Sequence, residues 1–126
     1  MSGAEPGTDQ IKASLLAERR QVQERMRTAE RDFERVVEAA RSVSTDDEHD
    51  PDGAGLAVER SQIVAVLEQA QDHLTRIDEA LARLSDGRYT VCEGCGGPIG
   101  AERLSARPSA TLCIRCAGKA QAARQR

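Results

Sequence analysis

Apolar side chains recur along two stretches of the chain at steps that mostly alternate between four and three residues. The first series begins near Asp9 and comprises Leu15, Val22, Met26, Ala29, Phe33, Val36, Ala40 and Val43. The second comprises Leu56, Ile63, Leu67, Ala70, Leu74, Ile77, Leu81 and Leu84. This spacing places the side chains along one stripe of an α-helix, as in the seam of a coiled coil. A polar residue interrupts each seam once, at Arg19 and at Arg60.

The linker between the two seams is short and polar. Residues 42–55 read SVSTDDEHDPDGAG, with one proline, two glycines and five acidic residues. Pro51 disfavours helix in the residue before it, and Asp52 can cap the helix that follows. We therefore expect a turn here, with residues 44–55 as the tip of a helical hairpin. Because the two seams have similar lengths, an antiparallel hairpin is favoured over the alternative, a coiled coil between chains.

The second helix is expected to end at residues 85–89, SDGRY, where Gly87 suits a left-handed helix terminator. The sequence thus predicts a mostly α-helical protein. A disordered segment, residues 1–8, precedes a coiled-coil hairpin over residues 9–86. Residues 87–126 follow as a separate element.

Composition also favours long helices packed along a seam over a thick globular core. Charged residues make up 31% of the chain and aromatic residues 2%. The net charge of −3 conceals an asymmetry, because residues 1–86 carry 11 basic and 19 acidic residues, whereas residues 87–126 carry 7 and 2. The acidic excess argues against a protein that coats nucleic acid, while the basic end can meet phosphate or an acidic protein surface.

The chain shows no signal for a membrane or for export. It has no run of about eighteen apolar residues that would predict a membrane span. The opening residues, MSGAEPGTDQ, lack the basic and apolar regions of a secretory signal. We expect a cytoplasmic protein, in a compartment where disulfides are disfavoured.

The strongest chemical signal is the arrangement of the cysteines. All four lie in two Cys-x-x-Cys pairs separated by seventeen residues: Cys92, Cys95, Cys113 and Cys116. Each pair can aim both sulfurs at one tetrahedral metal from one tight turn, with the bends permitted by Gly94, Gly96 and Gly97. We predict one structural Zn²⁺ in a finger that spans residues 87–126 and continues into a short C-terminal helix.

Several consequences follow from this zinc assignment. The finger has too few large apolar residues to fold without metal. Four thiolates leave a formal charge of −2, which Arg103, Arg107 or Arg115 could partly offset. Catalytic zinc is disfavoured because it keeps a coordination position open for water. His49 and His73 have no ligand spacing to the cysteines, and His73 is interpreted as a solvated helix residue. A thiol redox switch and structural disulfides are the alternatives.

A composite motif extends beyond the cysteine spacing. Its residues are Cys92, Cys95, Gly96, Ile99, Arg103, Leu104, Ala106, Pro108, Ala110, Cys113 and Cys116. With these residues and the preceding hairpin, the chain resembles the DksA/TraR family of bacterial transcription regulators over roughly residues 9–120. The resemblance implies a C4-type zinc finger at the base of a coiled-coil hairpin.

The resemblance also implies a function without catalysis. Family members bind RNA polymerase directly and need no specific DNA sequence. The hairpin enters the secondary channel, and the finger and base rest on its rim. A monomer suits insertion into a narrow channel. The family's tip motif, D-x-x-D-x-A, places its second aspartate on Asp52 and its alanine on Ala54. His49 stands at the first position, where Asp50 or Asp47 can supply the missing acid.

Some family members bind the alarmone ppGpp against the polymerase rim. Arg76 and Arg107 occupy positions where the best-known branch has basic residues, whereas its third basic position is Ala117 here. Arginine can pair bidentately with phosphate. The two arginines are therefore candidate contacts to alarmone or polymerase rim, and two solvated arginines remain the alternative.

Two other functions compete with polymerase regulation. Adjacent Asp47 and Glu48 suit a transcript-cleavage factor, whose hairpin carries acids to a catalytic Mg²⁺. The basic end suits a zinc finger that binds nucleic acid, but it lacks an aromatic stacking platform and an obvious recognition helix, which argues against sequence-specific DNA recognition.

Overall fold

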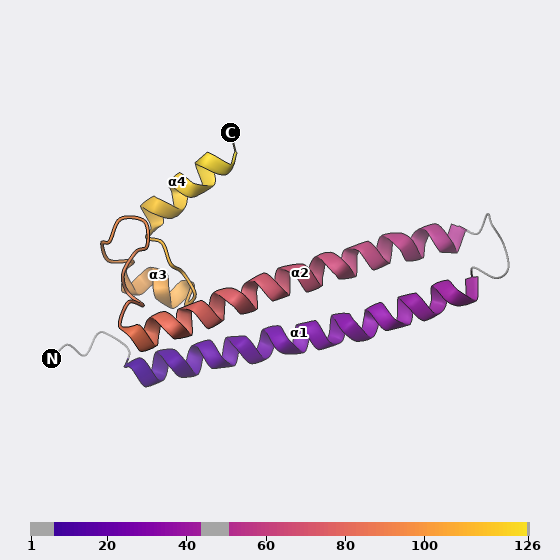
Figure 1. Ribbon diagram of the computed structural model, residues 1–126, viewed down its shortest axis with the longest axis horizontal. Coiled ribbons are helices and arrows are strands. Elements are labelled where there is room, and N and C mark those ends of the chain that lie inside the picture. The colour runs from indigo at the N-terminus through magenta and orange to yellow at the C-terminus, as the bar shows by residue number, and fades with distance from the viewer. Residues whose placement is uncertain (1–6, 44–50, 126) are drawn as a thin grey trace. The chain divides into compact units, whose positions relative to one another are not determined.

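The computed structural model describes residues 7–43 and 51–125, which form four helices (Figure 1). The two long helices are α1 (Thr8–Val43) and α2 (Pro51–Asp86), and the two short ones are α3 (Ala101–Ala106) and α4 (Ile114–Arg124). The described residues contain no strand, only an isolated bridge between Val91 and Pro98. The mostly helical fold, with two long packed helices and clustered cysteines, confirms the predicted fold class.

The chain divides into two compact units, and each long helix contributes to both. The finger unit contains α1 up to Arg19 together with the chain from Thr75 onward. The central unit contains Arg20–Leu74, the middle of the sequence. The last turns of α2 therefore belong with the cysteine-rich segment.

The core of the finger unit combines seam residues with residues of the finger itself. Leu15 and Ile77 of the predicted seam are completely buried. Ala80, which lies outside that seam, is 1% exposed, whereas the predicted seam residue Leu81 is half-buried. Within the finger, the buried apolar side chains are Tyr89, Cys92, Ile99 and Leu104. The polar interruption of the seam at Arg19 has a partner across the helix pair, because its Nε lies 2.7 Å from Asp78 Oδ1. That hydrogen bond raises the pKa of Arg19.

In the central unit, the seam is well packed at some positions and open at others. Val22, Ala29 and Val36 of α1 and Ala70 of α2 are buried, as the spacing predicts. The larger seam residues are only half-buried: Met26, Phe33, Leu56, Ile63, Leu67 and Leu74. Ala40 is exposed, so its assignment to the packed seam was wrong.

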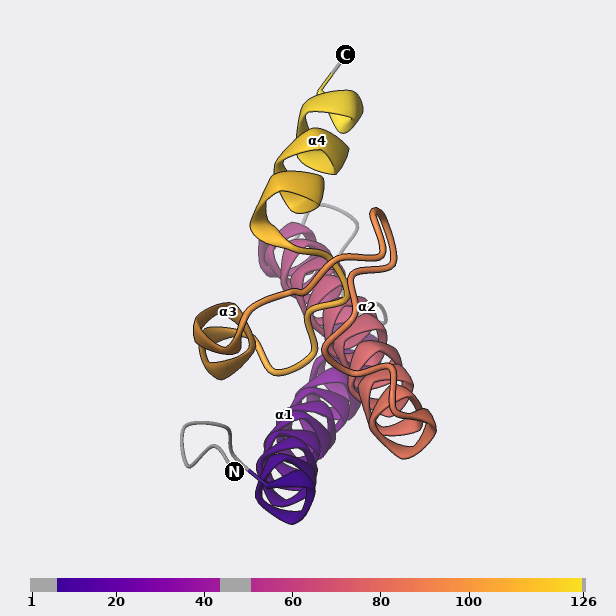
Figure 2. The same cartoon turned by 90° about the vertical axis from the view of Figure 1, so that its left-hand side faces the viewer.

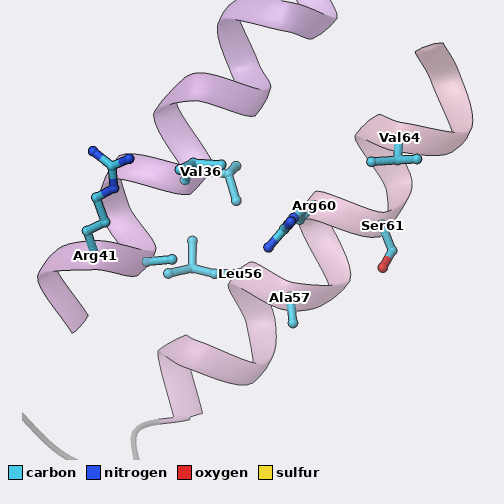
Figure 3. A pocket seen from close by; sticks show the side chains of 9 residues that line it. Val36, Arg41, Leu56, Ala57, Arg60, Ser61 and Val64 are labelled. Carbon is cyan, nitrogen blue, oxygen red and sulfur yellow. The ribbon is translucent and has the colours of Figure 1, made fainter. Parts of the chain in front are cut away.

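The open part of the central seam is a groove between α1 and α2 of about 730 Å³ (Figure 3). Its lining includes Val36, Ala40, Leu56, Ala57 and Arg60. Arg60 interrupts the seam, and its guanidinium lies 5.5 Å from the centroid of the Phe33 ring. Small alanines and a long, exposed arginine do not fill the space between the helices here, so Leu56 is left half-buried.

The linker prediction needs two corrections. Helix α2 already begins at Pro51, so residues 51–55 are helical rather than part of the turn. Asp52 lies inside the helix and is not its N-cap. Proline is favoured at the first helical position because its missing N–H would have no intrahelical partner there. Helix α1 begins at Thr8, one residue before the predicted start.

The end of α2 follows the prediction closely. Gly87 has a φ of 79°, the left-handed conformation that glycine adopts without steric cost. The N–H of Gly87 donates to the carbonyl of Leu84 (3.3 Å), and the N–H of Arg88 donates to that of Arg83 (2.8 Å). These two bonds form a Schellman motif. In the described ranges, no helix is long and apolar enough to cross a membrane.

Candidate metal centre

The fold brings the four cysteine sulfurs together. One ligand atom from each of Cys92, Cys95, Cys113 and Cys116 lies within 4.8 Å of the others. The first pair lies in the loop after α2, and the second lies at the start of α4. Figure 2 shows α3 and α4 leaving this group of loops in different directions. The pairs are therefore held by loops and one short helix rather than by a sheet.

The first pair sits in a tight turn. The N–H of Cys92 donates to the carbonyl of Gly97 (2.8 Å), and the N–H of Gly96 donates to that of Cys92 (3.0 Å). Gly96 has a φ of 75°, which explains the need for glycine at this position. Gly94 is needed for a different reason, because a Cβ there would lie 3.0 Å from Cys116 Sγ. Its missing side chain lets the two pairs approach each other.

The second pair is joined to the first by backbone hydrogen bonds. Cys113 is the N-cap residue of α4, and the N–H of Ala117 donates to its carbonyl (2.9 Å). Across the site, the N–H of Glu93 donates to the carbonyl of Thr111 (2.9 Å). The loop before Cys113 is held further by Arg103, whose Nε donates to the carbonyl of Leu112 (2.7 Å). Arg103 thus supports the backbone, while Arg107 and Arg115 are exposed.

The electrostatics of the sulfurs suit a bound cation. Cys92 Sγ accepts hydrogen bonds from the N–H groups of Cys113 (3.2 Å) and Gly94 (3.3 Å). These donors, that of Cys113 above all, lower the pKa of Cys92 to about 6. The neighbouring cysteine side chains, first Cys113 and then Cys92, raise the pKa of Cys116 to about 12. Four thiolates this close repel one another, so a positive charge between them favours the ionisation of all four thiols.

The donor set therefore fits Zn²⁺. Four clustered sulfurs on two Cys-x-x-Cys pairs, with N–H donors directed at the sulfur of Cys92, match a closed tetrathiolate site. When bound, the metal would hold the two loops together and leave no coordination position for a substrate. All four cysteines are free thiols.

The finger contains polar contacts that the sequence did not reveal. Tyr89, the one tyrosine in the chain, donates from its hydroxyl to the carbonyl of Pro108 (2.6 Å). Burial raises the pKa of Tyr89, and the charge of Glu18 adds to this shift. Arg83 is buried beside the first cysteine pair. The available signals were weak: a single aromatic residue next to the motif, and an arginine that lies outside the seam.

The structure describes only some of the other predicted site residues. Arg76 is exposed on α2, and Arg107 is exposed directly after α3. Of the predicted tip, Ala54 is an exposed residue of α2. Asp47, His49, Asp50 and the side chain of Asp52 lie outside the described residues.

His73 is not simply solvated. It is half-buried, and its Nδ1 lies 3.4 Å from the Nη2 of Arg25 on α1. Both residues lie in the central unit. The imidazole therefore takes part in the contact between the long helices.

Comparison with known proteins agrees with the geometry. Residues 87–122 match the sequence model of the prokaryotic dksA/traR C4-type zinc finger. The chain is also 30% identical over 112 residues to the RNA polymerase-binding transcription factor DksA of Escherichia coli strain K12, an alignment that covers 88% of this chain and 74% of the relative. The chain belongs to the DksA/TraR family.

Other members of the DksA/TraR family extend this picture. A DksA of Caulobacter vibrioides strain NA1000 is 38% identical over 63 residues, which are 50% of this chain and 44% of that relative. The chain thus spans less than half the length of that relative. The solved structure of transcription factor DksA2 from Pseudomonas aeruginosa has a TM-score of 0.76 and 29% identity, and the match covers 94% of this chain and 86% of that one. The relatives are named as transcription factors.

Proposed function

We propose that this protein is a transcription regulator that binds RNA polymerase directly. Its hairpin would enter the secondary channel of the polymerase and modulate initiation without reading a DNA sequence. The main support for this proposal is the match to an RNA polymerase-binding DksA. The match covers 88% of the chain and so includes parts of both the hairpin and the finger. We also propose that the protein acts as a monomer in the cytoplasm, since a single hairpin fits a narrow channel.

The chemistry of the described residues supports a binding role rather than catalysis. A closed four-thiolate zinc site holds structure and offers no open position to a substrate. The finger end of the chain is basic, and Arg115, Lys119 and Arg124 on α4 are exposed. Such a surface suits an acidic rim on a protein partner. Arg76 and Arg107 are proposed as further contacts to the rim or to ppGpp.

The proposal predicts a complex with core RNA polymerase that forms without DNA. Purified protein should co-elute with cognate core polymerase in gel filtration, and raised salt should weaken the complex because charged surfaces contribute to it. A matched control is the chain with its zinc removed by a chelator, which should elute mainly free. If the zinc-loaded protein gives no complex, the proposal is wrong.

The proposed tip makes a separate prediction. Asp52→Asn should leave polymerase binding within about twofold while reducing the effect on open-complex lifetime by about tenfold, because a charge-assisted hydrogen bond is worth about 1.5–3 kcal/mol. The measurement is promoter-complex decay with cognate polymerase, with and without ppGpp. Asp72→Asn, an exposed substitution elsewhere on α2, is the control and should behave as wild type. Equal loss of binding and effect would contradict a distinct role for the tip.

The same reagents separate the competing functions. A transcript-cleavage factor would shorten RNA in backtracked complexes, and we expect no such RNA cleavage from this protein. A nucleic-acid-binding finger would bind DNA in the absence of polymerase, with a steep dependence on salt.

A further inference from the structure

Arg83 is a buried charge at the end of α2. Only 4% of the residue is exposed, although it lies outside the predicted seam, between Leu81 and Leu84. A guanidinium taken out of water is costly unless hydrogen bonds and an opposite charge compensate it. The partners of Arg83 therefore decide whether this part of the finger unit is stable.

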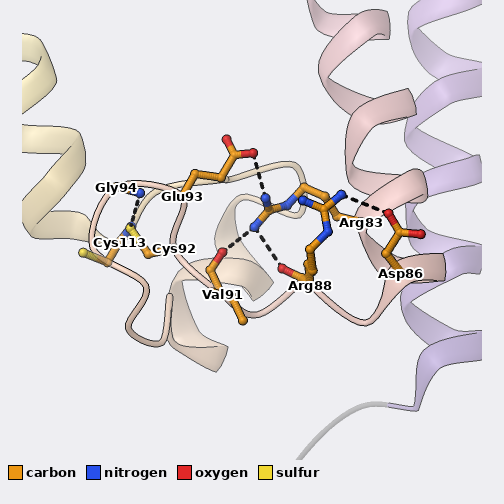
Figure 4. A network of polar contacts seen from close by, with 8 residues as sticks. All are labelled: Arg83, Asp86, Arg88, Val91, Cys92, Glu93, Gly94 and Cys113. Atoms are coloured by element: carbon orange, nitrogen blue, oxygen red, sulfur yellow. Dashed lines mark hydrogen bonds and ion pairs between the residues drawn. The ribbon is translucent and has the colours of Figure 1, made fainter.

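The partners that the structure describes lie in residues 88–93, the short segment around Cys92 (Figure 4). Nη1 lies 2.8 Å from Glu93 Oε2. Nη2 donates to the carbonyl of Arg88 (2.9 Å) and also to that of Val91. The remaining nitrogen, Nε, is buried and has no hydrogen-bond partner in the described part of the chain. The compensation for the buried charge that the structure describes thus comes from residues 88–93.

The conformation of this segment depends in turn on the metal centre. Val91 and Glu93 flank Cys92, so the position of that sulfur constrains both residues. The segment is held by the bridge from Val91 to Pro98 and by the bond from the Glu93 N–H to the Thr111 carbonyl. Thr111 lies close before Cys113. A metal that joins the two cysteine pairs would therefore fix the places of Glu93 and the Val91 carbonyl.

The backbone of Arg83 is tied to the same segment. Its carbonyl accepts the N–H of Arg88 in the Schellman motif that ends α2 (2.8 Å). Its side chain reaches back to the carbonyl of Arg88. The segment between α2 and Cys92 is thus held from both the main chain and the side chain of one residue.

We infer that Arg83 is a positioning residue for the metal centre, which couples zinc affinity to the folded end of α2 through Glu93 and the carbonyls of Arg88 and Val91. Without the metal, the segment loses its anchor and the guanidinium loses its partners. Without the guanidinium, the segment no longer holds Cys92 in its metal-binding place. The coupling is reciprocal: the contacts of Arg83 strengthen zinc binding by the same factor by which bound zinc stabilises those contacts.

The test is a zinc affinity measured on the full chain by competition with a chromogenic chelator of known affinity. Arg83→Met keeps much of the aliphatic stem and removes the charge. We expect zinc affinity to fall by about tenfold or more, the range found for residues behind metal ligands. The zinc affinity of Glu93→Gln should fall several-fold. The double variant should bind zinc no more weakly than Arg83→Met alone, because both substitutions remove the same interaction.

Arg88→Gln is the matched control. Arg88 is an arginine of the same segment, but its side chain is exposed and paired with the exposed Asp86 (2.9 Å). Its zinc affinity should stay within about twofold of wild type, since exposed ion pairs contribute little. Arg83→Lys should recover only part of the affinity, because an ammonium cannot reproduce the planar fork that reaches a carboxylate and two carbonyls.

A purely structural role for Arg83 gives a different result. A role confined to the packing of the long helices would lower the helical stability of the zinc-free and zinc-loaded chains equally. It would leave the zinc affinity unchanged, because the finger alone depends on the metal for its folding. Should Arg83→Met fail to fold, Glu93→Gln decides the matter, because the Glu93 side chain is 52% exposed and its loss is mild. Zinc affinities within twofold of wild type for every foldable variant at these two positions would overturn the inference.

Discussion

Replacing Cys92 with serine will unfold the finger while leaving the central unit helical. Cys92 is 2% exposed, and its sulfur accepts hydrogen bonds from two backbone N–H groups. A serine hydroxyl is not ionised at neutral pH and is a poor ligand for Zn²⁺. Because metal binding supplies the folding free energy of such small fingers, its loss removes the ordered structure of the segment.

Zinc content and hydrogen exchange together measure this effect. The variant should hold well under a tenth of the zinc of wild type, since structural zinc contributes about 10–16 kcal/mol through all four thiolates. Amides of residues 88–117 should lose protection, whereas those of Val22–Val36 should keep it. Ile114→Ser is the control, because Ile114 is 76% exposed beside Cys113. A zinc-loaded, fully protected Cys92→Ser protein would contradict the assignment.

Acid should produce the same change in the wild-type protein. Zinc binds thiolates, so protons compete with the metal and affinity falls as the pH decreases. In the folded finger, backbone N–H donors, that of Cys113 above all, lower the pKa of Cys92 to about 6, so its sulfur is ionised at neutral pH. Cys116, with its raised pKa, must lose its proton when the metal binds.

Ile77→Ala will lower the free energy of unfolding by about 2–5 kcal/mol, the cost of removing a large buried side chain and leaving a cavity. Ile77 has no exposed surface, and neither has Leu15, its counterpart in the α1 part of the same core. The measurement is urea unfolding of the zinc-loaded chain, monitored by circular dichroism.

Val58→Ala is the control for Ile77→Ala. Val58 is 58% exposed on the same helix, and alanine has the higher helix propensity, so its stability should change by less than about 0.5 kcal/mol. A loss below about 1 kcal/mol for Ile77→Ala would show that the seam contributes little at this position.

The parts of the fold that depend on local spacing could be predicted from the sequence. The helical seam was recognised because coiled-coil packing repeats every three or four residues, and Leu15, Val22, Ala29 and Val36 are indeed buried. The cysteine cluster was predicted because two residues between cysteines suffice to aim both sulfurs at one point. Gly87 ended α2 as expected because only glycine adopts its φ without cost.

Errors arose where local preference competed with packing. Pro51 was placed in a turn, although the first helical position accepts proline equally well, and the seam spacing does not distinguish the two. Ala40 follows the periodic pattern but is exposed, because its methyl group is too small to fill the groove beside Leu56 and Arg60. Helix α3 has only six residues and carries no periodic signal.

The sequence alone determined the two long helices, the two cysteine pairs and the family, because each rests on spacings between residues that lie close together in the chain. Tertiary structure alone decided that Arg83 is buried against residues 88–93 and that Tyr89 reaches Pro108. Arginine and tyrosine are usually placed at the surface or half-buried by their chemistry. Their burial here depends on carbonyls and a carboxylate that only the folded loops bring within hydrogen-bonding distance.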